Sequence, residues 1–79
     1  MSNTITKAQL EEIEEAKCWG ERQEAYELLE KYTGIRAKPY TAWIFYDEAD
    51  NYVGDSDNYS IRDLLENAYI EIIESEGTE

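Results

Sequence analysis

Hydrophobic residues in the first third of the chain recur at helical spacing, which predicts either one kinked helix or two consecutive helices. Thr6 and Gln9 form a capping box at the start of this region, which is typical of a helix N-terminus. Gly20 interrupts the pattern and costs a helix about 1 kcal/mol relative to Ala. The sequence therefore leaves open whether residues 6–33 are one helix or two, and Gly34 stands where a terminating glycine belongs. The apolar positions are Leu10, Ile13, Ala25, Leu28, Leu29 and Tyr32.

Beyond Pro39 the pattern changes to that of strands. Residues 40–46 are rich in aromatic and β-branched side chains and too short for a typical helix, so they predict a strand. This segment is apolar on both faces, which suits a strand that is covered or that lies in an interface. Residues 47–51 are turn residues, and residues 52–54 can return as a short antiparallel partner. We therefore expect a β-hairpin, preceded by a connector at 35–39.

A second capping box, Ser60 with Asp63, predicts the start of a final helix. Its core face consists of Ile61, Leu64, Leu65, Ala68, Ile72 and Ile73. The predicted order is helix, helix, hairpin and helix, which is a small single α+β domain (ααββα, or αββα with one kinked N-terminal helix). We expect residues 1–79 to form this one domain, with flexible ends at 1–5 and 75–79.

The charge is strongly unbalanced, with 19 acidic residues, seven basic ones and a formal net charge of −12. Eleven of the acids lie between Pro39 and the C-terminus, where Arg62 is the single base. A field of this sign repels nucleic acid and anionic membranes, and it attracts basic protein surfaces. The composition therefore predicts a protein partner with a basic surface, and no direct binding to nucleic acid or membrane.

The residues needed for common catalytic chemistry are missing. The chain has no histidine and one cysteine, which excludes Ser-His-Asp and Cys-His arrangements, and its four glycines form no phosphate-binding loop. We therefore predict no enzymatic activity and no cofactor. Cys18 has no second cysteine with which to form an internal disulfide, so we expect it to be buried and structural, in a cytoplasmic protein without a signal sequence or membrane span.

Residues 55–66 carry acids at positions 1, 3, 9 and 12 of a twelve-residue segment, as in part of a calcium-binding loop. Tyr59 occupies position 5, however, and Ser60 occupies position 6, where the sharp turn of such a loop needs glycine. The capping box also begins a helix at Ser60. We therefore predict no metal site, with one weaker alternative, a loose cation site formed by Asp47, Asp50, Asp55 and Asp57.

The remaining candidate surface combines acids and tyrosines on the hairpin and its exit loop. Its predicted partner-binding residues are Asp47, Glu48, Asp50, Tyr52, Asp55, Asp57 and Tyr59. We expect their carboxylates to lie about 5–7 Å apart, close to the spacing of phosphates along a nucleic-acid strand. A structural interpretation competes with this one: Tyr46, Tyr52 and Tyr59 pack the hairpin against the helices, and the acids serve turns and caps.

This profile resembles that of bacteriophage-encoded inhibitors of host defence proteins or host nucleic-acid enzymes. The resemblance implies a non-catalytic inhibitor that acts in the host cytoplasm and mimics nucleic acid at a basic, nucleic-acid-binding surface. The alternative hypothesis is a self-associating adaptor or regulatory subunit, such as a homodimer, whose interface is the apolar strand 40–46. Its decisive residues are Trp43, Ile44 and Phe45, and the acidity then serves solubility alone.

Overall fold

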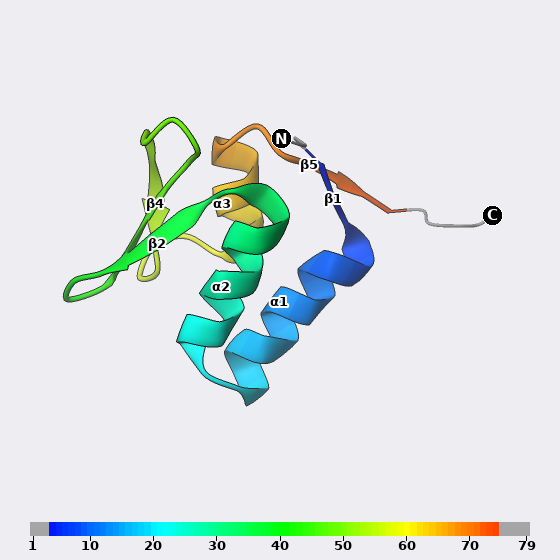
Figure 1. Cartoon of the computed structure of the whole chain (residues 1–79), viewed down its shortest axis with the longest axis horizontal. Helices are drawn as coiled ribbons and strands as arrows, with labels where there is room; N and C mark the ends of the chain where they lie inside the picture. Colours follow the sequence, from blue (N-terminus) through cyan, green and yellow to red (C-terminus); the bar gives the residue numbers. More distant parts are fainter. Residues whose placement is uncertain (1–3, 75–79) are drawn as a thin grey trace.

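The computed structural model describes residues 4–74, which form three helices and five short strands. In chain order these are β1 (Thr4–Thr6), α1 (Lys7–Trp19), α2 (Arg22–Thr33), β2 (Arg36–Pro39), β3 (Trp43–Tyr46), β4 (Tyr52–Asp55), α3 (Ile61–Asn67) and β5 (Glu71–Ile73). The strands make a three-stranded antiparallel sheet, β2–β3–β4, and a two-stranded parallel pair, β1–β5. The predicted α+β class is confirmed, and the helix–helix–hairpin–helix order lies within this arrangement (Figure 1).

The N-terminal region contains two helices, which run side by side in opposite directions (Figure 1). The Thr6 hydroxyl accepts a hydrogen bond from the Gln9 amide at 3.0 Å, and the Gln9 side chain accepts one from the Thr6 amide at 3.0 Å. The first helix ends where the backbone of Gly20 leaves the helical conformation. The second ends at Gly34, whose φ of 82° is a left-handed conformation that glycine adopts without steric cost.

The strands that precede α1 and follow α3 pair with each other, which the sequence pattern did not predict. Ile5 of β1 lies opposite Ile72 of β5, and Ile5 is buried in the core. The expectation that residues 1–5 form a flexible end is therefore wrong for Thr4 and Ile5. The other residues of the predicted flexible ends, 1–3 and 75–79, lie outside the described residues.

The central sheet has one strand more than the predicted hairpin. Residues 36–39, expected to belong to a connector, form β2 and pair with β3. The predicted strand at 40–46 begins only at Trp43, because its first three residues make the tight connection from β2. The turn at 47–51 and the returning strand β4 are present as predicted.

Helix α3 begins as predicted. The Ser60 hydroxyl accepts a hydrogen bond from the Asp63 amide at 3.2 Å, and the Asp63 carboxylate accepts one from the Ser60 amide at 3.1 Å. Ile61, Leu64 and Leu65 then face the core. This local signal is strong because it needs only residues three apart to satisfy the free amides of the first turn.

The end of α3 differs from the prediction. The amides of Tyr69 and Ile70 bond back to carbonyls of the last turn in a Schellman motif, with Ala68 as the cap. Tyr69 takes a left-handed conformation with φ 61°, a position that glycine usually fills. Ile72 and Ile73 therefore lie in β5 and not on the helix, where the sequence pattern had placed them.

The core lies between the helices and one face of the β2–β3–β4 sheet. Tyr26 of α2 packs its ring against Trp43, with centroids 5.0 Å apart, and edge-on against Phe45 at 4.9 Å. The other buried hydrophobic residues are Ile5, Leu10, Ile13, Ala25, Leu29, Ile35, Val53, Ile61, Leu64, Leu65 and Ile70. These aromatic contacts hold the sheet against α2. They therefore determine the positions of the loops at the two ends of the sheet.

Candidate partner-binding surface

The turn that joins β3 to β4 is organised around the carboxylate of Asp47. Its Oδ1 accepts hydrogen bonds from the amides of Asn51 at 2.8 Å and Ala49 at 2.9 Å. The bond from the Asn51 amide is the main cause that holds the pKa of Asp47 below its ordinary value. Asp50, in a left-handed conformation with φ 68°, pairs with Arg36 of β2. The Asp47 carboxylate therefore orders the backbone of a turn that also carries other carboxylates.

The loop after β4 is organised in the same way around Asp55. Its Oδ1 accepts hydrogen bonds from the amides of Asp57 at 3.0 Å and Asn58 at 2.9 Å, and its Oδ2 accepts one from the Tyr52 hydroxyl at 3.0 Å. Partial burial acts to raise the pKa of Asp55, but the hydrogen bonds from these three residues outweigh it, and the pKa is lowered. The bond to Asp55 raises the pKa of the Tyr52 hydroxyl.

The other predicted contact residues differ in how freely they can meet a partner. Glu48 and Asp57 are exposed, and Glu48 lies so close over Gly34 that a Cβ there would stand 2.5 Å from Glu48 Cγ. Tyr59 is half-buried and packs on the core, where its ring lies against Gly54. The structural interpretation thus holds for Tyr59, whereas Glu48 and Asp57 have side chains available for ion pairs.

The acidic residues of the predicted site form two clusters and not one continuous row. The acids of the 47–51 turn stand at the start of β4, and Asp55 and Asp57 stand at its end, so the two loops lie at opposite ends of the strand (Figure 1). β4 has four residues, which at about 3.3 Å per residue separates the clusters by on the order of 10–13 Å. The expected row with a spacing of about 5–7 Å is therefore replaced by two separated groups.

The residues predicted for self-association lie on two different faces of the sheet. Phe45 is 1% exposed and Trp43 packs against the core, both in contact with Tyr26. Ile44 lies between them in the strand and so faces the opposite side. Trp43, Ile44 and Phe45 cannot form one contact surface, because two of them are used by the chain's own core.

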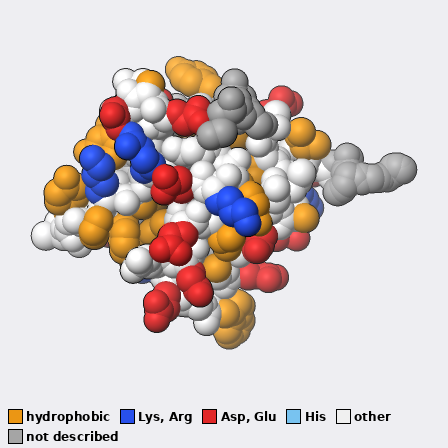
Figure 2. All heavy atoms as spheres, in the orientation of Figure 1, with side chains coloured by type: hydrophobic (Ala, Val, Ile, Leu, Met, Phe, Trp, Pro, Cys, Tyr) orange, Lys and Arg blue, Asp and Glu red, His pale blue; other side chains and the backbone are white. Residues whose placement is uncertain are grey.

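The helix pair and its connection carry eight acids, whose side chains are held differently from those of the hairpin loops. Figure 2 shows acidic side chains spread over the helices, with basic side chains both near the sheet and over the helices. Glu12 accepts a hydrogen bond from the Tyr32 hydroxyl at 2.6 Å, whereas Glu11 and Glu15 are exposed and make no hydrogen bond or ion pair with residues 4–74. The acids of this region are Glu11, Glu12, Glu14, Glu15, Glu21, Glu24, Glu27 and Glu30.

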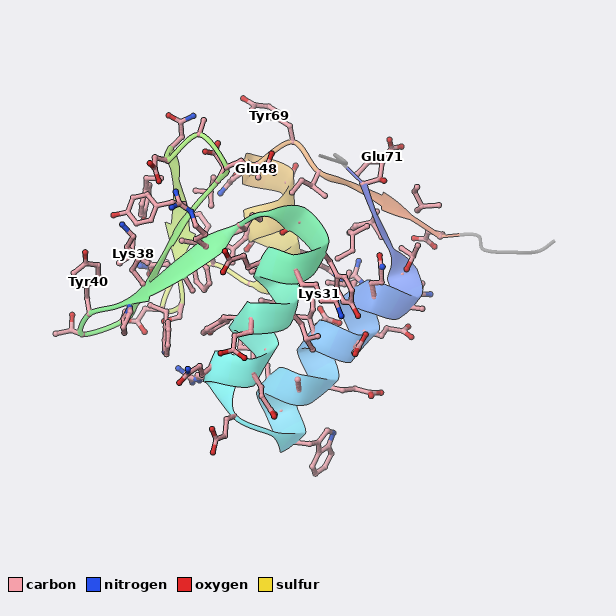
Figure 3. All side chains as sticks on the ribbon, in the orientation of Figure 1. Lys31, Lys38, Tyr40, Glu48, Tyr69 and Glu71 are labelled. Atoms are coloured by element: carbon pink, nitrogen blue, oxygen red, sulfur yellow. The ribbon has the colours of Figure 1, made fainter. Side chains whose placement is uncertain are left out.

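Several exposed residues were not singled out from the sequence. Trp19 and Tyr69 are each 89% exposed, and Tyr69 projects away from the body at the turn after α3 (Figure 3). Periodicity could not identify Tyr69, since the pattern placed it inside a helix. Cys18 is exposed and not buried as predicted, because the last turn of α1 extends beyond its core contacts at Leu10 and Ile13.

Within residues 4–74, no three His, Cys, Asp or Glu side chains are grouped so that they could hold a metal ion. The carboxylates of the loose cation site considered above, Asp47, Asp50, Asp55 and Asp57, are divided between the two ends of β4. None of the helices in the described range combines the length and the apolar character that crossing a membrane requires.

Comparison of the chain with protein-family models, with curated proteins and with solved structures found no match. The geometry and charge of the chain's own residues are therefore the basis on which its function can be inferred.

Proposed function

We propose that this protein is a non-catalytic inhibitor that binds a basic, nucleic-acid-binding surface on another protein. The observation that carries the proposal is the β3–β4 hairpin, whose two ends present carboxylates on loops ordered by hydrogen bonds to Asp47 and Asp55. Groups that are already ordered lose little conformational entropy on binding. We further propose that the inhibitor is phage-encoded, that its target is a host or defence protein, and that it acts in the host cytoplasm.

The two clusters suit the spacing of nucleic-acid phosphates. Successive phosphates along a strand lie on the order of 6–7 Å apart, so a separation of about 10–13 Å corresponds to about two steps. Arg and Lys side chains of the target that otherwise hold phosphates pair with Glu48 at one end and Asp57 at the other. Tyr52, 54% exposed on the same hairpin, supplies an aromatic contact of the kind that dominates binding energy. The net charge of −12 speeds the encounter by steering.

The test compares two variants of equal net charge. Glu48→Lys with Asp57→Lys reverses the freely exposed acids of the two clusters, whereas Glu11→Lys with Glu15→Lys reverses two exposed acids on α1. Both sites avoid Asp47 and Asp55, whose replacement would disturb the loops. Tagged parent and variant proteins are used to capture partners from bacterial lysate at low salt, and bound proteins are identified by mass spectrometry. Captured proteins are then purified, and displacement of a fluorescent duplex from them is measured.

We expect the parent and the α1 variant to retain the same partner. The hairpin variant should bind this partner with an affinity at least tenfold lower. We also expect the parent to displace the duplex, with an affinity that falls as salt rises. Equal losses for both variants would show that charge alone is responsible and that the hairpin is not the site. Binding without displacement of the duplex would exclude the competitive mechanism.

A further inference from the structure

The β2–β3–β4 sheet has a second face, turned away from the helices. The strand register places six residues on this outer face: Arg36, Lys38, Ile44, Tyr46, Tyr52 and Asp55. Lys38 and Tyr52 are exposed and the other four are half-buried, and Lys38 lies on the side of the sheet away from α2 (Figure 3). The centre of the face is apolar, with Ile44 beside the Tyr46 ring, which packs edge-on against Tyr52 at 6.4 Å.

This face carries less net negative charge than the helix pair. Two of the seven basic residues, Arg36 and Lys38, stand on it; Arg36 pairs with Asp50 of the adjoining turn, and Asp55 is the one acid among the six residues of the face. Residues 7–33, which contain the helix pair, carry eight acids against four bases, and Figure 2 shows acidic side chains spread over this side of the molecule. Arg36 and Lys38 balance Asp50 and Asp55 there, so two molecules of net charge −12 repel each other less across the outer face than across the helix pair.

The charges on the face are ordered across the strands. One row runs Lys38, Ile44, Asp55 from β2 to β4, so it is basic at one edge, apolar in the middle and acidic at the other. The neighbouring row runs Arg36, Tyr46, Tyr52, with a cation at the same edge and an aromatic ring opposite. Each row is complementary to its own reversed copy, which is what an isologous interface requires.

We infer that the outer face binds a second copy of this chain in a symmetric, face-to-face dimer whose two-fold axis runs parallel to the strands. This operation places β2 over β4 of the other copy and β3 over β3. Lys38 then meets the partner's Asp55, Arg36 meets the ring of the partner's Tyr52, and Ile44 meets the partner's Ile44. An axis across the strands would place β2 over β2 and bring Lys38 and Arg36 of the two copies together, so charge selects the first arrangement.

The inference stands apart from the proposed inhibitor function, although the dimer covers Tyr52 and Asp55 and so would compete with the proposed target. Three strands of four residues offer less area than a stable interface of about 1,200–2,000 Å² needs, which implies a weak dimer. We expect a dissociation constant on the order of 0.1–1 mM. Screening of the repulsion between the two copies should make the dimer tighter as salt rises from about 20 to 150 mM.

Sedimentation equilibrium tests the arrangement with a charge swap. Lys38→Glu and Asp55→Lys should each weaken the homodimer at least fivefold, since each places like charges opposite one another twice. Mixed in equal amounts, the two variants should form a heterodimer at least as tight as the parent dimer, because both ion pairs are restored. A parent that stays monomeric at 1–2 mM, or a Lys38→Glu variant that dimerises like the parent, would overturn the inference.

Asp55 also orders the loop after β4, so a cross-linking experiment decides the question if Asp55→Lys fails to fold. Ile44→Cys in a Cys18→Ser background places one thiol beside the axis, and mild oxidation should give a disulfide-linked dimer at high yield. The matched control is the parent, whose exposed Cys18 lies on α1 away from the face. Equal cross-linking through Cys18 and through position 44 would contradict the proposed face.

Discussion

The two faces of the β2–β3–β4 sheet use similar residues for different purposes. On the inner face Trp43 and Phe45 pack against Tyr26 and are part of the core. On the outer face Ile44 and Tyr46, from the same strand, remain half-buried beside basic residues of β2. An apolar strand is therefore no sign of an interface by itself, because every second side chain is taken by the fold. Only the outer set is available to a partner.

The largest expected effect distinguishes the two faces directly. Phe45→Ala should lower the free energy of unfolding by about 3–5 kcal/mol, because it leaves a cavity beside Tyr26. Ile44→Ala, one residue earlier on the other face, should cost no more than about 1.5 kcal/mol. Urea unfolding followed by circular dichroism measures both. Similar losses for the two variants would mean that the faces are not distinguished by burial.

A smaller effect reports on packing within the outer face. The centroids of the Tyr46 and Tyr52 rings are 6.4 Å apart. The Lys38 ammonium lies 5.1 Å from the centroid of the Tyr46 ring. Tyr46→Thr replaces tyrosine with another residue of high strand propensity but removes both contacts, so it should cost about 1 kcal/mol. Unfolding is measured at micromolar concentration, where the proposed dimer is dissociated. In a Tyr52→Thr background, the loss of stability caused by Tyr46→Thr should be at most half as large. If the loss is undiminished, it comes from the contact with Lys38 and not from the ring contact.

The smallest effect concerns the turn that joins the two strands. Asp47→Asn keeps a hydrogen-bond acceptor but removes the charge that the turn amides stabilise. Because the folded-state pKa of Asp47 is lowered, its contribution is present above the unfolded value of about 3.9 and is lost as pH falls through the folded value. The parent should exceed the variant in stability above about pH 5, and the difference should vanish toward pH 2.

Thermal unfolding across this pH range measures that difference, and Glu11→Gln serves as the matched control. Glu11 makes no hydrogen bond with residues 4–74, so its replacement reports the removal of one charge from an acidic molecule without any effect on a turn. If Asp47→Asn and Glu11→Gln follow the same pH profile, the hydrogen bonds of the turn do not stabilise the Asp47 carboxylate.

Much of the fold could be predicted because its signals are local. The boxes at Thr6 and Ser60 and the glycine at position 34 need only neighbouring residues to satisfy amides and carbonyls, and each is present. The sequence could not show that Glu48 is exposed whereas Tyr59 is half-buried. Both residues lie in polar loops, and the contacts that differ between them are made with distant parts of the chain.

From the sequence one could read the α+β class, the starts of α1 and α3, the hairpin turn and the strongly acidic charge, but not the break between α1 and α2. The folded structure was needed to see which side of β3 is buried, that β1 pairs with β5, and that α3 ends at a left-handed Tyr69. The reason is physical: capping and turn formation depend on residues a few positions apart. Strand pairing and the choice of a buried face depend on which surfaces meet after the chain has folded.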